Sequence, residues 1–187
     1  GNTALLKPSE LSAHTSEVLE KIINNAFPQE YLHVVQGGVE ETQALIALPV
    51  DYIFFTGSVS VGKIVMAAAA RNLTPLTLEL GGKSPTIILE DADLNLAVDG
   101  ALFGTFFHVG QVCESGTRCF VPESIYDDFM ERVRERVTHI KVGDPLDPET
   151  TMGPVISRAS TPPHRANWAH RAPRSKPARW PATRPGR

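Results

Sequence analysis

Short apolar runs alternate along most of the chain with longer segments in which apolar side chains recur every three or four positions. The runs that predict strands lie at residues 1–6, 32–35, 51–55, 76–80, 86–89 and 118–121. The segments that predict helices lie at residues 12–26, 40–47, 61–70, 93–107 and 122–139. Strands that alternate with helices over short loops are typical of an α/β domain with a mainly parallel sheet, which is the fold that we expect.

This alternation ends near residue 156. The segment 160–187 contains seven of the 18 Lys and Arg residues, no acidic residue, both tryptophans (Trp168 and Trp180) and six of the 15 prolines, without periodicity. Such a segment cannot bury enough apolar surface to offset its ordering entropy, so we expect a disordered C-terminal tail. A basic segment with tryptophans could bind nucleic acid. We favour instead a disordered end or an out-of-frame translation of GC-rich sequence.

The composition is that of a protein with an ordinary core. Of the 187 residues 42% are hydrophobic, enough to build one domain and part of a second. No apolar run reaches the roughly 18 residues that span a membrane, and the N-terminus has no signal-peptide pattern. The two cysteines, Cys113 and Cys119, do not suggest a disulfide-stapled secreted domain, so we expect the cytoplasm. The six histidines show no metal-ligand spacing, and we assign no metal.

A glycine turn follows the predicted strand at 51–55. Gly57 and Ser58 stand at this turn, and Gly62 lies just inside the helix that comes next. A strand, a turn and a helix start point backbone N–H groups and the helix dipole at whatever lies over the turn, which suits a phosphate. The Gly-x4-Gly spacing differs from the GxGxxG fingerprint. A glycine after a strand can also be only a turn, so the local pattern leaves both interpretations open.

Lys7 and Glu10 flank the end of the first predicted strand, where ligands of open α/β sheets bind. A carboxylate at this place could accept hydrogen bonds from ribose hydroxyls. Alternatively, Ser9 and Glu10 only favour the N-terminal end of the next helix. The local pattern favours this second interpretation.

Two further positions combine reactive side chains with glycine-rich turns. Glu79 is the charged residue of the apolar run 76–80. Partial desolvation there would raise its pKa and make it a candidate general base, although a strand-end acid facing solvent fits equally well. Cys113 lies among polar residues and glycines after the apolar run 101–107, which favours a nucleophile over a buried thiol. Cys119 lies in the predicted strand 118–121, where we expect burial. We expect Cys113 and Glu79 to belong to one active site.

Several motifs together resemble the aldehyde dehydrogenase superfamily. They are GNTALLKPSE at 1–10, FTGS at 55–58 with Gly62, LELGGKSP at 78–85 and GQVC at 110–113. Their order and the 34-residue step from Glu79 to Cys113 match the family pattern. The resemblance covers about residues 1–158. It implies a Rossmann-like fold, with 1–80 as part of the NAD-binding domain, 81–158 as part of the catalytic domain, and 159–187 outside the family pattern.

The resemblance also implies roles for single residues. Cys113 would be the nucleophile, and Glu79 the base that activates it or the hydrolytic water. Lys7 and Glu10 would contact the adenosine ribose of NAD, and Ser58 the pyrophosphate. The cofactor site would also include Gly57, Gly62 and Leu80. A carboxylate near the ribose repels a 2′-phosphate, so Glu10 favours NAD, although some members of the family also accept NADP.

The implied reaction oxidises a small aldehyde to a carboxylic acid through a thiohemiacetal and a thioester on the cysteine. Full-length relatives are expected to be homo-oligomers. Family members run to several hundred residues, so we expect this sequence to be an incomplete chain with little or no activity of its own. Two alternatives stay open. One is an acylating member that passes the thioester to coenzyme A, and the other is a non-catalytic protein on the same scaffold.

Overall fold

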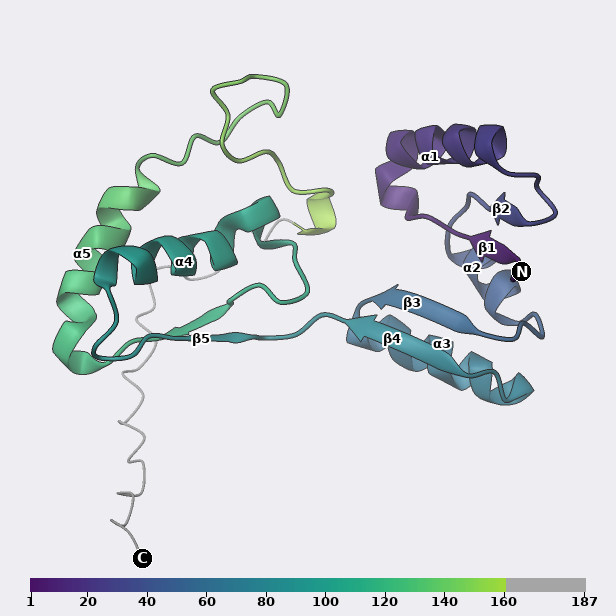
Figure 1. Ribbon diagram of the computed structural model, residues 1–187, viewed down its shortest axis with the longest axis horizontal. Helices are drawn as coiled ribbons and strands as arrows, with labels where there is room; N and C mark the ends of the chain where they lie inside the picture. The colour runs from purple at the N-terminus through teal and green to yellow at the C-terminus, as the bar shows by residue number, and fades with distance from the viewer. Residues whose placement is uncertain (161–187) are drawn as a thin grey trace, which may run out of the picture. The chain divides into compact units, whose positions relative to one another are not determined.

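The computed structural model describes residues 1–160 of the chain (Figure 1). Its strands are β1 (Ala4–Leu6), β2 (Leu32–Val34), β3 (Ile53–Gly57), β4 (Leu76–Leu80), β5 (Pro85–Ile87) and β6 (Arg118–Phe120). Its α-helices are α1 (Ala13–Ala26), α2 (Val39–Ile46), α3 (Val59–Asn72), α4 (Leu94–Phe106) and α5 (Tyr126–Val137). Short 3-10 helices are η1 (Glu10–Ser12), η2 (Phe107–Gly110), η3 (Glu123–Ile125) and η4 (Arg158–Ser160). The predicted disordered or nucleic-acid-binding tail lies outside the described residues, apart from its first positions.

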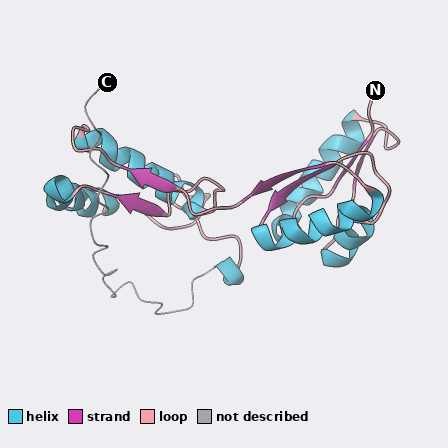
Figure 2. Cartoon of the chain, turned by 90° about the horizontal axis from the view of Figure 1, so that it is seen from below, coloured by secondary structure: helices cyan, strands magenta, loops and turns pink. Residues whose placement is uncertain are grey.

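The described strands form three parallel pairs, β1 with β2, β3 with β4 and β5 with β6. In each pair the chain leaves the first strand, forms an α-helix and returns to the second strand in the same direction (Figure 2). This repeated βαβ arrangement confirms the predicted α/β fold with parallel strands. The boundaries proposed for the two domains, at residues 80 and 158, stay predictions.

The pair β3–β4 carries helix α3 on one face. The buried side of α3 consists of Gly62, Val65 and Ala69, which recur at helical spacing. A Cβ atom on Gly62 would lie 2.7 Å from a methyl carbon of Leu80, so only glycine lets the helix approach β4 this closely. Because side chains alternate along a strand, Glu79 points to the face of β4 opposite Leu80.

A second packed group is formed by β5, β6, α4 and α5. Its centre is a cluster of buried apolar residues, namely Ile88, Val98, Ala101 and Phe129. Polar contacts also join the two helices: Arg132 donates a hydrogen bond to the Asn95 side chain at 2.6 Å, and Arg136 forms an ion pair with Asp99. This group carries the segment that contains both cysteines.

Apart from Asn95 and Asp99, helix α4 carries mostly apolar residues, and these are not confined to its buried side. Val98 and Ala101 are buried, but Leu96, Phe103 and Phe107 at its other side and its end are exposed. The rings of Phe103 and Phe107 stack on each other with centroids 4.9 Å apart. Within residues 1–160 no helix is both long and apolar enough to span a bilayer.

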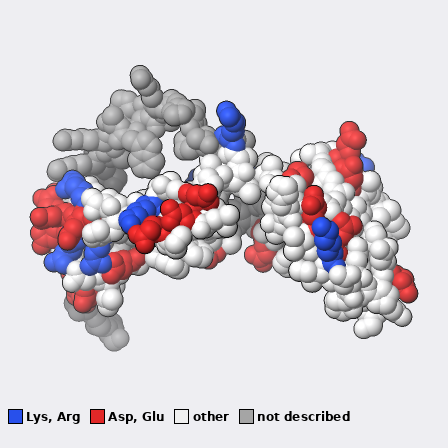
Figure 3. Space-filling model, turned by 90° about the horizontal axis from the view of Figure 1, so that it is seen from above, with Lys and Arg blue, Asp and Glu red and all other residues white. Residues whose placement is uncertain are grey.

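Charged side chains of both signs share the surface. On the face seen in Figure 3, Lys and Arg residues lie among Asp and Glu residues and do not form a continuous basic stripe. A basic stripe is the surface expected of a protein that binds nucleic-acid backbones. The described residues therefore show no such surface on this face.

Candidate active site

Cys113 lies in a loop between α4 and β6, residues 107–117, which we call the cysteine loop. The end of this loop is fixed to the end of α4. The Gly116 N–H donates to the Gly104 carbonyl at 2.9 Å, and the Thr105 hydroxyl donates to the Gly116 carbonyl at 3.2 Å. Ser115 is buried, and its hydroxyl donates to the Thr105 carbonyl at 3.4 Å. The residues just after Cys113 are thus held by one backbone and two side-chain hydrogen bonds.

The same loop is wedged against strand β5. A Cβ atom on Gly116 would lie 2.3 Å from the Thr86 hydroxyl oxygen, far inside a van der Waals contact. Gly116 is itself buried. Glycine is therefore required here for the loop to pass β5 at this distance.

Before Cys113 the backbone makes a left-handed turn. His108, Val109 and Gly110 have φ angles of 51°, 62° and 73°. Glycine adopts this conformation without cost, but a β-branched valine is strongly disfavoured in it. Such strain persists only where the surrounding structure imposes it, and it concentrates at functional sites. The turn reverses the chain immediately before the nucleophile segment.

Replacing Val109 by glycine is expected to stabilise the protein. The change removes a left-handed strain of roughly 1–2 kcal/mol and adds roughly 0.5–1 kcal/mol of unfolded-chain entropy. The free energy of unfolding in urea should therefore rise by about 1 kcal/mol. Gly110→Ala is the matched control, and it should lower this free energy, because a Cβ there would lie 2.9 Å from the Thr105 carbonyl oxygen. A lower free energy of unfolding in Val109→Gly would contradict the inference that the left-handed conformation of Val109 is strained.

Gln111 connects the cysteine loop to a distant segment. Its side-chain amide nitrogen donates to the His108 carbonyl at 3.3 Å, and its amide oxygen accepts from the Ile156 N–H at 3.0 Å. Both ends of the amide are therefore used, and 45 residues separate Gln111 from Ile156. The sequence pattern showed Gln111 only as a polar neighbour of the cysteine, because a pattern does not reveal a partner so far along the chain.

The Cys113 thiol is exposed and meets a carboxylate. Its Sγ donates a hydrogen bond to Oε2 of Glu114 at 2.9 Å. This hydrogen bond and the negative charge of Glu114 both favour the neutral thiol, and so they raise the pKa of Cys113. No role for Glu114 was predicted, because the direction of its side chain cannot be inferred from the sequence pattern.

The prediction that Cys119 is buried is wrong. Cys119 is exposed, because within residues 1–160 strand β6 pairs on one edge only, with β5. Neighbouring atoms still displace part of its hydration, which raises the pKa of the Cys119 thiol. Both cysteines are free thiols.

Glu79 is exposed on the free face of β4, which confirms the interpretation of a strand-end acid facing solvent rather than that of a partly desolvated carboxylate. Strand β4 pairs with β3 alone in the described part of the chain, and nothing there covers this face. The turn after Glu79 does approach the cysteine loop. A Cβ atom on Gly82 would lie 3.9 Å from the Cys113 carbonyl oxygen. The next residue, Lys83, accepts a hydrogen bond through its carbonyl from Arg118 of β6 at 2.9 Å.

The structure thus brings the segment of Glu79 to the cysteine loop, but not the Glu79 side chain to the thiol. Among the described residues, the carboxylate in contact with Cys113 is that of Glu114. A common active site for Cys113 and Glu79 therefore stays a prediction, which the approach of Gly82 supports.

Lys7 and Glu10 form an ion pair at the end of β1. Their Nζ and Oε2 atoms are 2.9 Å apart, and the Lys7 side chain is 15% exposed against 49% for Glu10. The Lys7 ammonium lowers the pKa of the Glu10 carboxyl. Ser9 accepts a hydrogen bond from the Leu11 N–H at 3.3 Å and so caps η1, as the second interpretation of this segment predicted. Glu10 instead pairs with Lys7, and its side chain is half-exposed.

Ser58 caps helix α3. Its hydroxyl oxygen accepts from the Val61 N–H at 3.2 Å and lies 2.9 Å from the Ser60 hydroxyl. Gly57 ends β3 just before it, so the strand, turn and helix start occur as predicted. Gly62 and Leu80 contact each other, which gives both residues a packing role.

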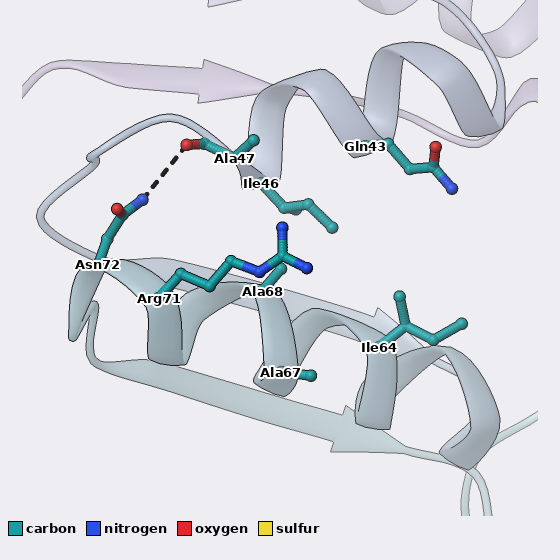
Figure 4. A pocket seen from close by; sticks show the side chains of 8 residues that line it. All are labelled: Gln43, Ile46, Ala47, Ile64, Ala67, Ala68, Arg71 and Asn72. Atoms are coloured by element: carbon teal, nitrogen blue, oxygen red, sulfur yellow. Dashed lines mark hydrogen bonds between the residues drawn. The ribbon is translucent and has the colours of Figure 1, made fainter.

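A groove of about 520 Å³ runs between α2 and α3 (Figure 4). Ile46 and Ile64 project into it from the two helices, and Arg71 extends from α3 towards α2. At one end the Asn72 amide donates to the Ala47 carbonyl at 3.2 Å. Small residues at Ala67 and Ala68 leave this space open. The alanine-rich stretch of α3 was the available sequence signal, but the groove appears only when the two helices are placed side by side.

Three features of the described residues offer contacts to an anion, a ring and a hydroxyl. In residues 1–160 no group of three His, Cys, Asp or Glu residues is placed to hold a metal ion. The capped N-terminus of α3 suits an anion. The apolar walls of the groove suit a flat ring. The half-exposed carboxylate of Glu10 suits a hydroxyl.

Comparison with known proteins gives a single family. The model of the aldehyde dehydrogenase family matches residues 1–166. The chain is 50% identical over 130 residues to 4,4'-diaponeurosporen-aldehyde dehydrogenase of Staphylococcus aureus, covering 70% of this chain and 28% of that protein. It is 48% identical over 162 residues to 4-trimethylaminobutyraldehyde dehydrogenase B of Danio rerio, covering 85% of this chain and 31% of that protein.

A solved structure agrees with these relatives. Betaine aldehyde dehydrogenase from Staphylococcus aureus in complex with NAD+ superposes with a TM-score of 0.76 at 42% identity. The match covers 84% of this chain and 32% of that one. The chain therefore spans about a third of the length of the curated relatives that it matches.

Proposed function

This chain belongs to the aldehyde dehydrogenase family, and from that premise we propose that it supplies the nucleophile and the NAD-binding segment for oxidation of an aldehyde to a carboxylic acid. The observation that carries the proposal is the cysteine loop. Cys113 is presented on a loop fixed to α4 and β5, and the glycine turn that follows Glu79 lies against its backbone. A loop fixed in this way can hold a thiol in one position for an incoming carbonyl.

Cys113 acts as the nucleophile. Its thiolate adds to the aldehyde carbonyl, and a C–S bond forms while the carbonyl electron pair moves to the oxygen. The Cys113 backbone N–H is a candidate donor to that oxyanion. Lys7, Glu10 and Ser58 would hold NAD, which would supply the hydride acceptor for the carbon bound to Cys113. What remains is a thioester on Cys113.

Glu79 acts as the base for the second half of the reaction. It takes a proton from a water molecule, which attacks the thioester carbon and releases the carboxylic acid and the Cys113 thiol. An exposed carboxylate at the edge of β4 has the freedom to reach such a water. The acylating alternative would replace this water by coenzyme A.

The residues at the carboxyl ends of β1 and β3 fit the cofactor. Lys7 and Glu10 would bind the ribose, and the N-terminus of α3 at Ser58 would bind the pyrophosphate. The groove between α2 and α3 would accept the flat base. Glu10 favours NAD, because its charge repels a 2′-phosphate. The free thiols are compatible with a reducing compartment such as the cytoplasm.

The role of Glu79 can be tested by replacing it with glutamine. Glu79→Gln should slow hydrolysis of the thioester by roughly 10²–10⁴-fold, so that an acyl group accumulates on the Cys113 peptide. Mass spectrometry under single-turnover conditions detects this adduct even in a chain that turns over slowly. Acylation is expected to be slow, because the Glu114 carboxylate raises the pKa of the exposed Cys113 thiol.

The control is Glu17→Gln, which removes an exposed carboxylate on α1 and should leave the adduct level unchanged. The dissociation constant for NAD should be the same in all three proteins. A large rise of this constant in Glu79→Gln would assign Glu79 to cofactor binding instead. Formation of an acyl-coenzyme A product in place of the acid would favour the acylating alternative.

A further inference from the structure

The side chain nearest to the nucleophilic sulfur is that of Glu114. Its Oε2 atom lies 2.9 Å from the Cys113 Sγ, and both residues are exposed. Any molecule that reaches Sγ must therefore come within a few ångströms of a carboxylate. Neither the family chemistry described above nor the cofactor site uses this group.

Such a carboxylate acts on the charge of an approaching electrophile. Two unit charges in water attract or repel measurably at about 4 Å, and a cation and an anion are affected in opposite directions. A cationic reagent should therefore react roughly tenfold faster than an anionic reagent with the same reactive group. Salt reduces the ratio, because both groups are exposed.

Two basic residues, Lys83 and Arg118, lie on the segments beside the loop. The Arg118 Nε–H donates to the Lys83 carbonyl at 2.9 Å, and the guanidinium lies 5.8 Å from the centre of the Phe120 ring. His108, at the start of the loop, has its ring beside that of Phe107. The charged group that acts on the Cys113 thiol is Glu114.

We propose that Glu114 is a specificity-determining residue that directs aldehydes carrying a positively charged ammonium group to Cys113. The proposal rests on the proposed role of Cys113 as the nucleophile. A cationic substrate would pair with the carboxylate and compete with the Sγ–H···Oε2 hydrogen bond. The thiol then loses the acceptor that holds its proton, and solvent can remove that proton. An anionic aldehyde is repelled and leaves the hydrogen bond intact.

The test uses thiol reagents that share one reactive group and differ in charge. Methanethiosulfonates with a trimethylammonium, a sulfonate or an uncharged methyl group react with the full chain in a Cys119→Ala background, so that only Cys113 reports. Rates at low ionic strength are divided by the rates for a small free thiol. We expect the cationic reagent to exceed the anionic one by roughly tenfold. Glu114→Gln should bring this ratio to about one, and Glu114→Asp should preserve most of it.

A matched control and a pH profile complete the design. Glu131→Gln removes an exposed carboxylate from α5 and should leave the charge ratio unchanged. With the uncharged reagent, the labelling rate rises with pH as the thiolate forms. This rise should begin at a lower pH in Glu114→Gln than in the parent. This direction follows because the carboxylate raises the thiol pKa, so its removal lets the thiolate form earlier. Circular dichroism checks that each variant is folded.

The last part of the experiment measures how well aldehydes protect Cys113 from labelling. A trimethylammonium aldehyde should protect Cys113 from labelling at a lower concentration than an aldehyde that carries a carboxylate, and Glu114→Gln should remove the difference. Equal charge ratios in the parent and in Glu114→Gln would overturn the proposal, even with Cys113 fully reactive. Failure of Cys113 itself as the nucleophile would be seen separately, as retained aldehyde oxidation in a protein without this cysteine.

Discussion

In a full-length protein that contains this segment, Cys113→Ala is expected to abolish aldehyde-dependent formation of NADH and of the thioester on the cysteine, by at least about 10⁴-fold. The physical reason is that the thiohemiacetal, from which the hydride leaves, needs a sulfur at this position of the cysteine loop. Alanine fits the exposed site without strain, so the fold should be kept. NADH absorbance and the mass of the Cys113 peptide measure the two outcomes.

Cys119→Ala is the matched control for this prediction. Cys119 lies in β6, paired with Thr86 of β5, and outside the cysteine loop. Most of the activity should remain after its replacement. A similar loss in the two variants would contradict the assignment of Cys113 as the nucleophile.

Phe129→Ala is expected to lower the free energy of unfolding by about 3–5 kcal/mol. The Phe129 side chain is 3% exposed and lies in the cluster with Val98 and Ala101, so its removal leaves a cavity between α4 and α5. Domains are typically stable by only about 5–15 kcal/mol. This one change should therefore bring the β5–β6 group close to unfolding, which urea titration followed by circular dichroism would measure.

Phe103→Ala provides the comparison. Phe103 is 67% exposed on α4 and stacks on Phe107, so its loss should cost no more than about 1.5 kcal/mol. Equal losses for Phe103 and Phe129 would show that the cluster around Val98 is not the core of this group.

Elements bounded by strong local signals were predicted well from the sequence. Strand β4 occupies residues 76–80 as expected, because Pro75 precedes it and the Gly81–Gly82 turn follows it. Strand β3 was expected at 51–55 but runs from Ile53 to Gly57. Its end is set by pairing with β4, in which Gly57 lies opposite Leu80, and a single strand's pattern contains no information about its partner.

The site was predicted in part for the same reason. Residue types and spacing identified Cys113, Glu79 and Ser58 as candidates, since these depend on local chemistry. The exposure of Cys119 was predicted wrongly and that of Glu79 was left open, because burial on a strand depends on which other elements cover it. The contact between Cys113 and Glu114 depends on side-chain direction, which the sequence pattern does not contain.

Gly116 and Thr86 compete for one volume, since a Cβ on the first would lie 2.3 Å from the hydroxyl oxygen of the second. Positions related in this way are free to vary only as a pair, with any gain in size at 116 matched by a loss at 86. Among homologous sequences, the residues at positions 116 and 86 should therefore co-vary. A larger residue at position 86 can therefore shift the cysteine loop even if the sheet itself is intact. We expect β5 to tolerate fewer substitutions at this position than an edge strand that contacts no such loop.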